Sequence, residues 1–259
     1  MKPRISIITV CYNSEAHIEE AILSVVNQLY ENKEYIIIDG GSTDGTLDII
    51  AKYRDKIDYF VSEPDRGISD AFNKGIDAAT GDIIGIINSD DKLVEEALQV
   101  VVENYDPNVD CYRGICNAWN DETGFVFLER PTLCWPKIPI KMRVGHPATF
   151  VPKETYQKWG NFDVTLKYAM DADLLLRLSR NKANIKYISK PLAYFRLGGV
   201  SQSSESKRLK ELKVILKKNG SNWGQIQLFV CYYRLRLLFK HIIMFIAGSD
   251  ARFLFSKRY

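Results

Sequence analysis

The sequence predicts an α/β fold in which a mostly parallel central sheet is covered by helices and followed by a helical extension. Between residues 4 and 91, short runs of β-branched residues alternate with segments of helical periodicity. The strand runs are apolar at successive positions, as in strands that are buried on both faces of a parallel sheet. With 259 residues and 46% hydrophobic content, the chain can bury a sizeable core without disulfides, which excludes a disordered protein.

The first half of the chain contains four strand patterns and three helix patterns. The strands are expected at residues 5–10, 35–38, 57–61 and 82–87. The helices are expected after an N-cap at Ser14, with apolar residues spaced by three and four up to residue 26, and at 47–50 and 68–79. Further along, we expect helices over 153–159 and 171–180, short strands over 185–189 and 193–195, and mixed strands and loops over 110–152.

Polar residues follow four successive strands, at the point where each strand ends. These segments are Tyr12-Asn13, Asp39-Gly40-Gly41-Ser42, Glu63-Pro64-Asp65 and Asn88-Ser89-Asp90-Asp91. Ligands of open parallel sheets bind beyond the carboxyl ends of the strands. This edge of the sheet is therefore the predicted site.

Two features of this edge have both a chemical and a structural interpretation. Adjacent carboxylates such as Asp90 and Asp91 repel each other, which favours a site for Mg²⁺ or Mn²⁺. The alternative is a solvated turn that caps a helix starting near Lys92. The glycine-rich segment 39–46 lacks the G-x-G-x-x-G and G-K-[ST] patterns, so it predicts neither a dinucleotide site nor a P-loop. By itself it is more typical of a structural strand-to-helix turn.

Taken together, the motifs resemble those of the inverting family 2 glycosyltransferases, which have the GT-A fold. Besides the strand-end segments, the resemblance includes Asp65-Arg66-Gly67, Asn73-Lys74-Gly75, Gly81-Asp82, His146-Pro147-Ala148-Thr149-Phe150, Gly160-Asn161-Phe162-Asp163, residues 169–177 and residues 195–201. It covers about residues 4–201. It implies a GT-A catalytic domain over residues 1–203, with a donor half (1–92) and an acceptor half (93–203), and leaves residues 204–259 as a basic helical extension.

The resemblance also implies roles for donor-side residues. Val10 and Tyr12 would line the nucleotide base, Asp39 would accept the N3–H of uracil, and Asp65, Gly67 and Asn73 would border the ribose and diphosphate. Asp90 would hold Mn²⁺ or Mg²⁺ as the last residue of the family's D-x-D motif. In this chain Asn88 replaces the first acidic residue of that motif, and Asp91 is the second choice as a metal ligand.

The same resemblance implies a catalytic base on the acceptor side. Asp171 matches the Asp of the family's Glu-Asp pair, whereas Met170 replaces the Glu. Asp173 is a weaker candidate, and a carboxylate at a helix N-terminus is the structural alternative for Asp171. His146 would contact the diphosphate, the metal or the acceptor, or pack as a structural residue. Arg177 is a further candidate contact, although a structural ion pair is favoured for it.

The C-terminal segment has a different charge from the rest of the chain. Residues 201–259 contain 12 lysines and arginines and 3 acidic residues, a net charge of +9, whereas the whole chain carries +3. Basic residues interspersed with aliphatic and aromatic ones predict an anionic membrane surface as partner. No single apolar stripe runs along this segment, so packing on the catalytic domain is the alternative. Nucleic-acid binding is not expected, because no nucleic-acid-binding motif accompanies the basic residues.

The sequence thus predicts an inverting, metal-dependent transferase. It would move a hexosyl or N-acetylhexosaminyl group from a UDP-sugar to a hydroxyl of a glycan or lipid-linked saccharide, in bacterial cell-surface polysaccharide synthesis. Five cysteines without a C-x-x-C pair, and no apolar run of 18 residues, predict a cytoplasmic protein, peripheral on the inner face of the membrane. The alternatives are a nucleotidyltransferase, whose glycine-rich basic signature residues 9–14 lack, and a catalytically dead sugar-nucleotide-binding subunit.

Overall fold

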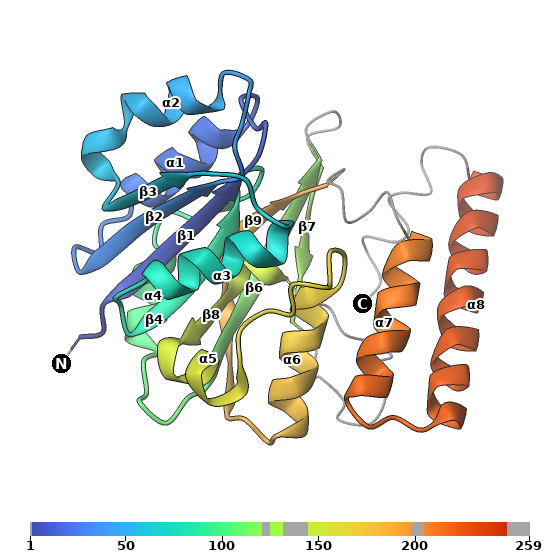
Figure 1. Ribbon diagram of the computed structural model, residues 1–259. Helices are drawn as coiled ribbons and strands as arrows, with labels where there is room; N and C mark the ends of the chain where they lie inside the picture. Colours follow the sequence, from blue (N-terminus) through green and yellow to red (C-terminus); the bar gives the residue numbers. More distant parts are fainter. Residues whose placement is uncertain (1, 121–124, 132–144, 198–204, 248–259) are drawn as a thin grey trace.

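One nine-stranded sheet organises the protein in the computed structural model, which describes residues 2–120, 125–131, 145–197 and 205–247. The strand order is β3-β2-β1-β4-β8-β6-β9-β5, and β7 pairs with β6. Helices cover both faces of the sheet, and a helical hairpin lies at its side (Figure 1). Cys134 and the predicted motif residues 198–201 lie outside the described residues.

The donor half is a parallel sheet with alternating helices, as predicted. Its strands are β1 (Ile5–Cys11), β2 (Lys33–Asp39), β3 (Tyr59–Ser62) and β4 (Ile83–Asn88), all paired in parallel. Its helices are α1 (Ile18–Val26), α2 (Thr46–Lys52) and α3 (Ile68–Ala78), with a short 3-10 helix at Arg54–Lys56. Ile7 belongs to the core that α1, α2 and α4 cover, and Ile8 to the core on the α3 side, because side chains alternate along a strand.

The acceptor half adds mixed strands to the same sheet. Its elements are β5 (Lys92–Leu93), α4 (Ala97–Glu103), β6 (Cys111–Asn120), β7 (Phe125–Glu129), a 3-10 turn (His146–Ala148), β8 (Thr149–Pro152), α5 (Lys153–Trp159), α6 (Met170–Arg180) and β9 (Ile185–Arg196). Strand β8 runs antiparallel to β4, so the sheet is parallel in the donor half and mixed beyond it.

Three local expectations differ from the structure. No helix starts near Lys92, because that residue begins β5, which pairs with β9. The two short strands expected between residues 185 and 195 form the single strand β9. Ser14 does not cap α1: the helix starts at Ile18, and the Ser14 hydroxyl bonds the hydroxyl of Ser89 at 2.7 Å.

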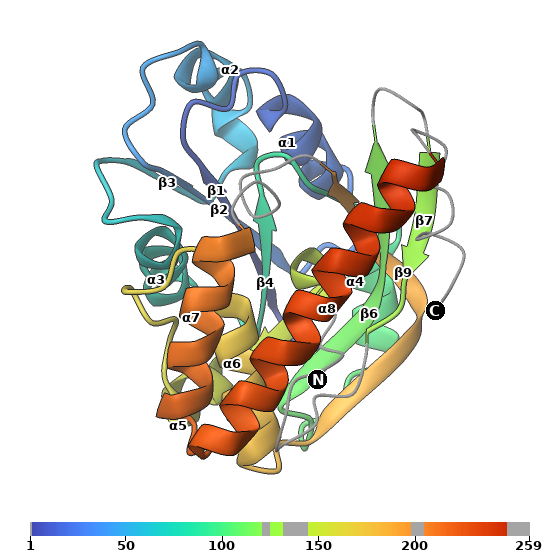
Figure 2. The same cartoon turned by 90° about the vertical axis from the view of Figure 1, so that its right-hand side faces the viewer.

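The C-terminal segment forms an antiparallel hairpin of α7 (Glu205–Lys218) and α8 (Trp223–Ala247) (Figures 1 and 2). Leu212, Ile215 and Leu216 of α7 are buried in the core that contains α6. Helix α7 therefore packs on the catalytic domain, which was the alternative predicted for this segment. Among the helices of the described residues, none is long and apolar enough to cross a membrane.

Candidate functional site

The carboxyl ends of β1, β2 and β4 meet at one edge of the sheet, together with the segment that follows β3. A Cβ atom added to Gly40 would lie 2.6 Å from Oδ2 of Asp65 and 3.4 Å from the ring of Tyr12. Gly40 therefore lies against both of these predicted donor residues, which are close to each other at this edge. Tyr12 is 61% exposed at the end of β1, which is unusual for an aromatic side chain next to a buried strand.

Asp39 is buried under the loop that follows β2, with no exposed surface. Its Oδ2 accepts hydrogen bonds from the N–H groups of Gly41 (3.0 Å) and Ser42 (2.9 Å) and from the Ser62 hydroxyl (2.6 Å). Its Oδ1 accepts from the Ser42 hydroxyl (2.5 Å). Burial raises the pKa of Asp39, but the hydrogen bonds from Ser42 and Ser62 outweigh it and leave that pKa below its ordinary value. Because the side chain has no exposed surface, a direct bond to uracil would require the loop to move, so the structure favours an indirect role in shaping the loop.

Two other predicted donor residues are engaged inside the protein. Val10 is 5% exposed and packs in the core, so its side chain presents almost no surface to a base. The amide of Asn73 donates to the carbonyl of Phe162 (2.9 Å) and accepts from its N–H (3.0 Å), which joins α3 to the segment before α6. Asp65 and Gly67 lie at the edge as predicted: Asp65 accepts the N–H of Gly67 at 2.7 Å.

The two adjacent carboxylates after β4 have different surroundings. Asp91 is 1% exposed, and its oxygens accept the backbone N–H of Arg196 (3.0 Å) and the amide of Asn88 (3.0 Å). Burial raises the pKa of Asp91, and the charge of Asp90 raises it further. Burial also raises the pKa of Asp90, whose side chain is only half-buried. Asp90 is therefore presented at the edge, whereas Asp91 is tied into the protein and is a poor second metal ligand.

A divalent cation fits this end of β4. The side-chain oxygen of Asn88 is buried without a hydrogen-bond partner, close to Asp90 in the chain, and such an orphaned oxygen costs free energy unless a ligand satisfies it. Amide and carboxylate oxygens are suitable ligands for Mg²⁺ and Mn²⁺. Across the described residues, no cluster of three or more His, Cys, Asp and Glu side chains could hold a metal by itself. A small number of protein ligands is sufficient for an ion that is also coordinated by the phosphates of a substrate.

Asp171 and His146 lie near each other on the acceptor side. Asp171 is the second residue of α6, and its Oδ1 accepts the N–H of Ala172 at 2.7 Å, so the helix N-terminus stabilises its charge. The ring of His146 stacks on Phe72 with centroids 5.0 Å apart, and its Nε2 is buried without a partner. Burial lowers the pKa of His146, and the nearby charge of Asp171 opposes that shift. His146 is thus a neutral, packed ring beside the predicted base.

Asp173 and Arg177 form an ion pair with each other. Nε of Arg177 lies 2.8 Å from Oδ2 of Asp173, which has no exposed surface. The guanidinium also donates to the carbonyls of Trp159, Gly160 and Asn161. Their charged groups are used within the fold, so the structural ion pair favoured for Arg177 is present, and a contact of either residue with an acceptor or diphosphate stays a prediction.

Two residues near the candidate site, Lys167 and Glu211, were not predicted from the sequence. The Cε of Lys167 lies 3.6 Å from the position of an added Gly67 Cβ, so its exposed side chain lies beside the donor loop. Glu211 of α7 accepts three backbone N–H groups from the segment that leads into α6. The sequence signal for Glu211 was an isolated acidic residue in a lysine-rich helix.

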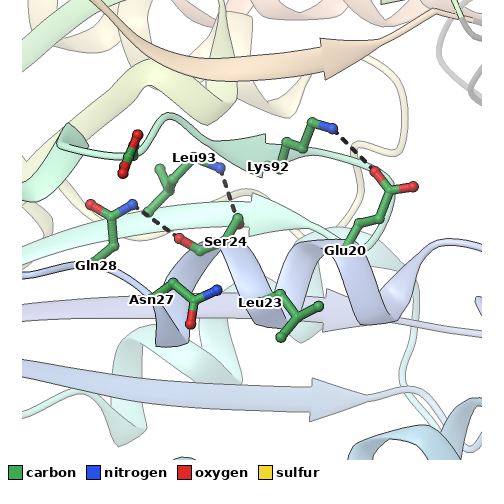
Figure 3. A pocket seen from close by; sticks show the side chains of 8 residues that line it. Glu20, Leu23, Ser24, Asn27, Gln28, Lys92 and Leu93 are labelled. Carbon is green, nitrogen blue, oxygen red and sulfur yellow. Dashed lines mark hydrogen bonds and ion pairs between the residues drawn. The ribbon is translucent and has the colours of Figure 1, made fainter.

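A separate open hollow of about 590 Å³ lies between α1 and β5 (Figure 3). Its polar groups bond one another: Lys92 pairs with Glu20 at 3.2 Å, and the Leu93 N–H donates to Ser24. Gln28 donates to backbone carbonyls, including that of Val94 at 2.7 Å. These groups are already satisfied, so the strand-end edge remains the candidate site.

Two solved structures have a fold similar to that of this chain. A solved fragment of Staphylococcus aureus TarS, in complex with UDP-GlcNAc, has a TM-score of 0.67 and 20% identity, covering 89% of this chain and 72% of that one. The mannosyltransferase PcManGT of Pyrobaculum calidifontis, in complex with GDP-Man and Mn²⁺, has a TM-score of 0.64 and 16% identity, covering 90% of this chain and 69% of that one. These likenesses extend over both halves, and they confirm the predicted GT-A-type fold.

Sequence relatives are glycosyltransferases as well. The poly-beta-1,6-N-acetyl-D-glucosamine synthase of Staphylococcus aureus is 33% identical over 114 residues, which are 42% of this chain and 28% of that protein. In the first three curated relatives the alignments span 40%, 59% and 42% of the relative's length. The family model for glycosyl transferase family 2 matches residues 6–158. That match covers more than half of the 259 residues, and the chain therefore belongs to glycosyl transferase family 2.

Proposed function

We propose that this glycosyltransferase moves a hexosyl or N-acetylhexosaminyl group from a UDP-sugar to a hydroxyl of a glycan or lipid-linked saccharide, with inversion, in bacterial cell-surface polysaccharide synthesis. The observation that carries the proposal is the convergence of Tyr12, Asp65 and Asp90 at one edge of the sheet. The TarS complex with UDP-GlcNAc and the poly-N-acetylglucosamine synthase support the donor and the product class.

The donor would lie over Gly40. The exposed ring of Tyr12 offers a stacking face for the base, and Asp39 holds the loop against which the base would rest. Asp65 would accept hydrogen bonds from the ribose. Lys167, beside Gly67, would add a positive charge near the diphosphate.

Asp90 and the orphaned oxygen of Asn88 would hold Mg²⁺ or Mn²⁺, in line with the Mn²⁺ in the PcManGT complex. When bound, the cation supplies positive charge that neutralises the departing diphosphate. Asp91 supports this site through its bonds to Asn88 and Arg196.

Asp171 would take the proton from the acceptor hydroxyl. Its carboxylate is half-buried in the first turn of α6, and a positioned carboxylate can act as a general base. The hydroxyl oxygen then bonds the anomeric carbon as the bond to the diphosphate breaks, through an oxocarbenium-like state. With one base and no enzyme nucleophile, a single displacement inverts the anomeric configuration.

The hairpin of α7 and α8 supplies the surface by which the enzyme would reach a membrane. Five lysines of α7 are exposed: Lys207, Lys210, Lys213, Lys217 and Lys218. Lys207 and Lys218 also contact Tyr168 and Asp163 of the catalytic domain, which leaves the other three free of such contacts among the described interactions. Exposed side chains of α8 recur at spacings of three and four, at Leu228, Cys231, Leu235, Leu238 and Ile242. The opposite face of α8 contains the buried residues Phe229 and Val230. Two apolar faces explain why the sequence shows no single stripe.

The charge of the hairpin favours an anionic lipid surface over a second copy of the chain. At 100° per residue, Arg234 and Arg236 flank the outer stripe on its two sides, where they would reach lipid headgroups. The acidic residues Glu205 and Glu211 are both engaged in hydrogen bonds within the protein. Pairing two copies would bring together two segments of +9 each.

Vesicle sedimentation tests this surface. The protein should bind vesicles that contain about 30% phosphatidylglycerol, partly reversed by salt, and ignore neutral phosphatidylcholine. Leu235→Glu should reduce binding several-fold, whereas Leu29→Glu makes the same change at an exposed position of the donor half and should change binding little. Unchanged binding by Leu235→Glu, or a dimer in solution that this variant dissolves, would reject the lipid assignment.

A panel of sugar nucleotides, tested for binding and turnover with and without Mn²⁺, tests the function. We expect UDP-sugars to bind most tightly and a suitable acceptor to give a product of inverted configuration. Donor binding without transfer or hydrolysis would favour a dead binding subunit. Release of pyrophosphate from UTP and a sugar phosphate would favour a nucleotidyltransferase.

A further inference from the structure

The carboxylate of Glu211 accepts three consecutive backbone N–H groups from a segment more than 40 residues earlier. Its Oε1 accepts from Lys167 at 2.9 Å, and its Oε2 accepts from Tyr168 at 2.8 Å and from Ala169 at 2.9 Å. Hydrogen bonds to an ionised carboxylate are about twice as strong as neutral ones. One side chain of α7 therefore fixes the conformation of the whole segment 167–169.

This segment is the entry to α6, the helix that carries Asp171. Ala169 occupies the N-cap position and has no side-chain oxygen, so it cannot cap the helix. Asp171 lies two residues beyond Ala169, in the first turn. Glu211 thus holds the backbone that leads into α6, rather than the first-turn N–H groups that a capping side chain would accept.

Other contacts between α7 and this region act in the same direction. Nζ of Lys207 lies 5.6 Å above the ring of Tyr168, and the amide of Asn219 donates to Asp173 at 3.3 Å. Helix α7 and Asn219, the residue directly after it, therefore contact the segment before Asp171 and the first turn of α6. The extension is attached to the part of the catalytic domain where the base is expected.

We infer that Glu211 is a positioning residue for Asp171, so that the C-terminal extension takes part in proton transfer from the acceptor. The inference rests on the proposed role of Asp171 as base. Glu211 acts through the backbone of residues 167–169, which sets where the first turn of α6 begins. A displacement of about 1 Å at a catalytic group can cost about 100-fold in rate.

The test separates positioning from stability by comparing two glutamates on the same helix. Glu205 is also hydrogen-bonded, but to the Tyr233 hydroxyl of α8, within the extension. Glu211→Ala should lower kcat by about 10- to 100-fold and leave the donor Kd within about threefold, because every proposed donor residue except the exposed Lys167 lies outside the segment 167–169. Glu205→Ala should lower Tm and leave kcat within about twofold. Glu211→Gln keeps one acceptor oxygen and the side-chain shape, and should restore part of the lost kcat.

The outcomes are distinguishable. A normal kcat in both Glu211 variants, with Asp171→Asn inactive, would overturn the inference and leave the base intact. Full turnover by Asp171→Asn would instead reject the proposed base. If Glu211→Ala does not fold, Glu211→Gln decides: hydrogen exchange should then accelerate at the amides of residues 167–169, together with a lower kcat. Faster exchange with unchanged kcat would also reject positioning.

Discussion

Asp91 and Arg196, which are 105 positions apart in the sequence, are joined through a carboxylate that accepts a backbone N–H at 3.0 Å. Arg196 in turn donates from Nε to the carbonyl of Asp90 at 3.1 Å, and its guanidinium lies 4.6 Å from the ring centre of Trp119. The end of β9 is thereby attached to the turn after β4. Although Asp90 and Asp91 have the same side chain, that of Asp91 holds the turn, whereas that of Asp90 is presented at the edge of the sheet.

These different roles predict that a substitution at Asp90 affects activity, whereas a substitution at Asp91 affects stability. Asp90→Ala should abolish transfer and remove the Mn²⁺ dependence of donor binding, with little change in Tm, because it deletes a charged oxygen ligand at the edge. Asp91→Asn should lower Tm, because an amide cannot accept at both positions as the carboxylate does. Donor titrations with and without Mn²⁺, paired with thermal melts, check both variants. Normal turnover in Asp90→Ala, or full activity in excess EDTA, would refute the metal site.

Two variants distinguish the proposed base, Asp171, from the neighbouring ion pair of Asp173 and Arg177. Asp171→Asn keeps the shape of the side chain but cannot take a proton, so kcat should fall by about 100-fold or more at unchanged donor affinity. Asp173→Asn leaves Arg177 without its buried partner, so it should reduce the free energy of unfolding by about 3 kcal/mol. Initial rates and urea unfolding distinguish the two. Exchanged phenotypes would mean that the wrong aspartate has been assigned as base.

Stacking on Tyr12 should contribute most of the affinity for the base. Tyr12→Ala should weaken UDP binding by about 5- to 150-fold, the equivalent of about 1–3 kcal/mol. Tyr12→Phe retains the ring and should bind UDP within about threefold of the original protein. Calorimetric titration with UDP measures both. Equal losses in the two variants would show that the hydroxyl, rather than the ring face, makes the contact.

The contact between the extension and the catalytic domain should depend on pH. The hydrogen bond from Lys218, at 2.7 Å, lowers the pKa of Asp163 to about 2. A lowered carboxyl pKa stabilises the fold above about pH 4, the unfolded value, and this stabilisation is lost as the pH falls through about 2.

Lys218→Met should therefore cost less than about 1 kcal/mol at pH 7, since Lys218 is more than half exposed, and the difference should shrink between pH 4 and 2. Lys217→Met, at the neighbouring exposed position, is the control and should have no such pH dependence. Urea unfolding over this pH range provides the measurement. A pH-independent difference for Lys218→Met would mean that the pair does not set the pKa of Asp163.

The sequence by itself determined the parallel sheet of residues 1–92 and the edge of that sheet where the site is proposed. Strands such as β1 are apolar at nearly every position, and polar residues follow them directly, so local patterning predicts both the parallel sheet and its binding edge. The helix that carries Asp171 was likewise predictable from its apolar spacing. These features depend on residues that are close in the chain.

Only the tertiary structure decided which polar residues of this edge remain available. Asp39, Asn73 and Asp91 look like ligands in the sequence, yet each bonds a residue far away in the chain: Ser62, Phe162 and Arg196 respectively, 23 to 105 positions away. Glu211 gains its role from a segment it meets only when α7 packs on α6. Burial makes a polar group bond inside the protein, and the partner that satisfies it depends on the arrangement of the whole chain.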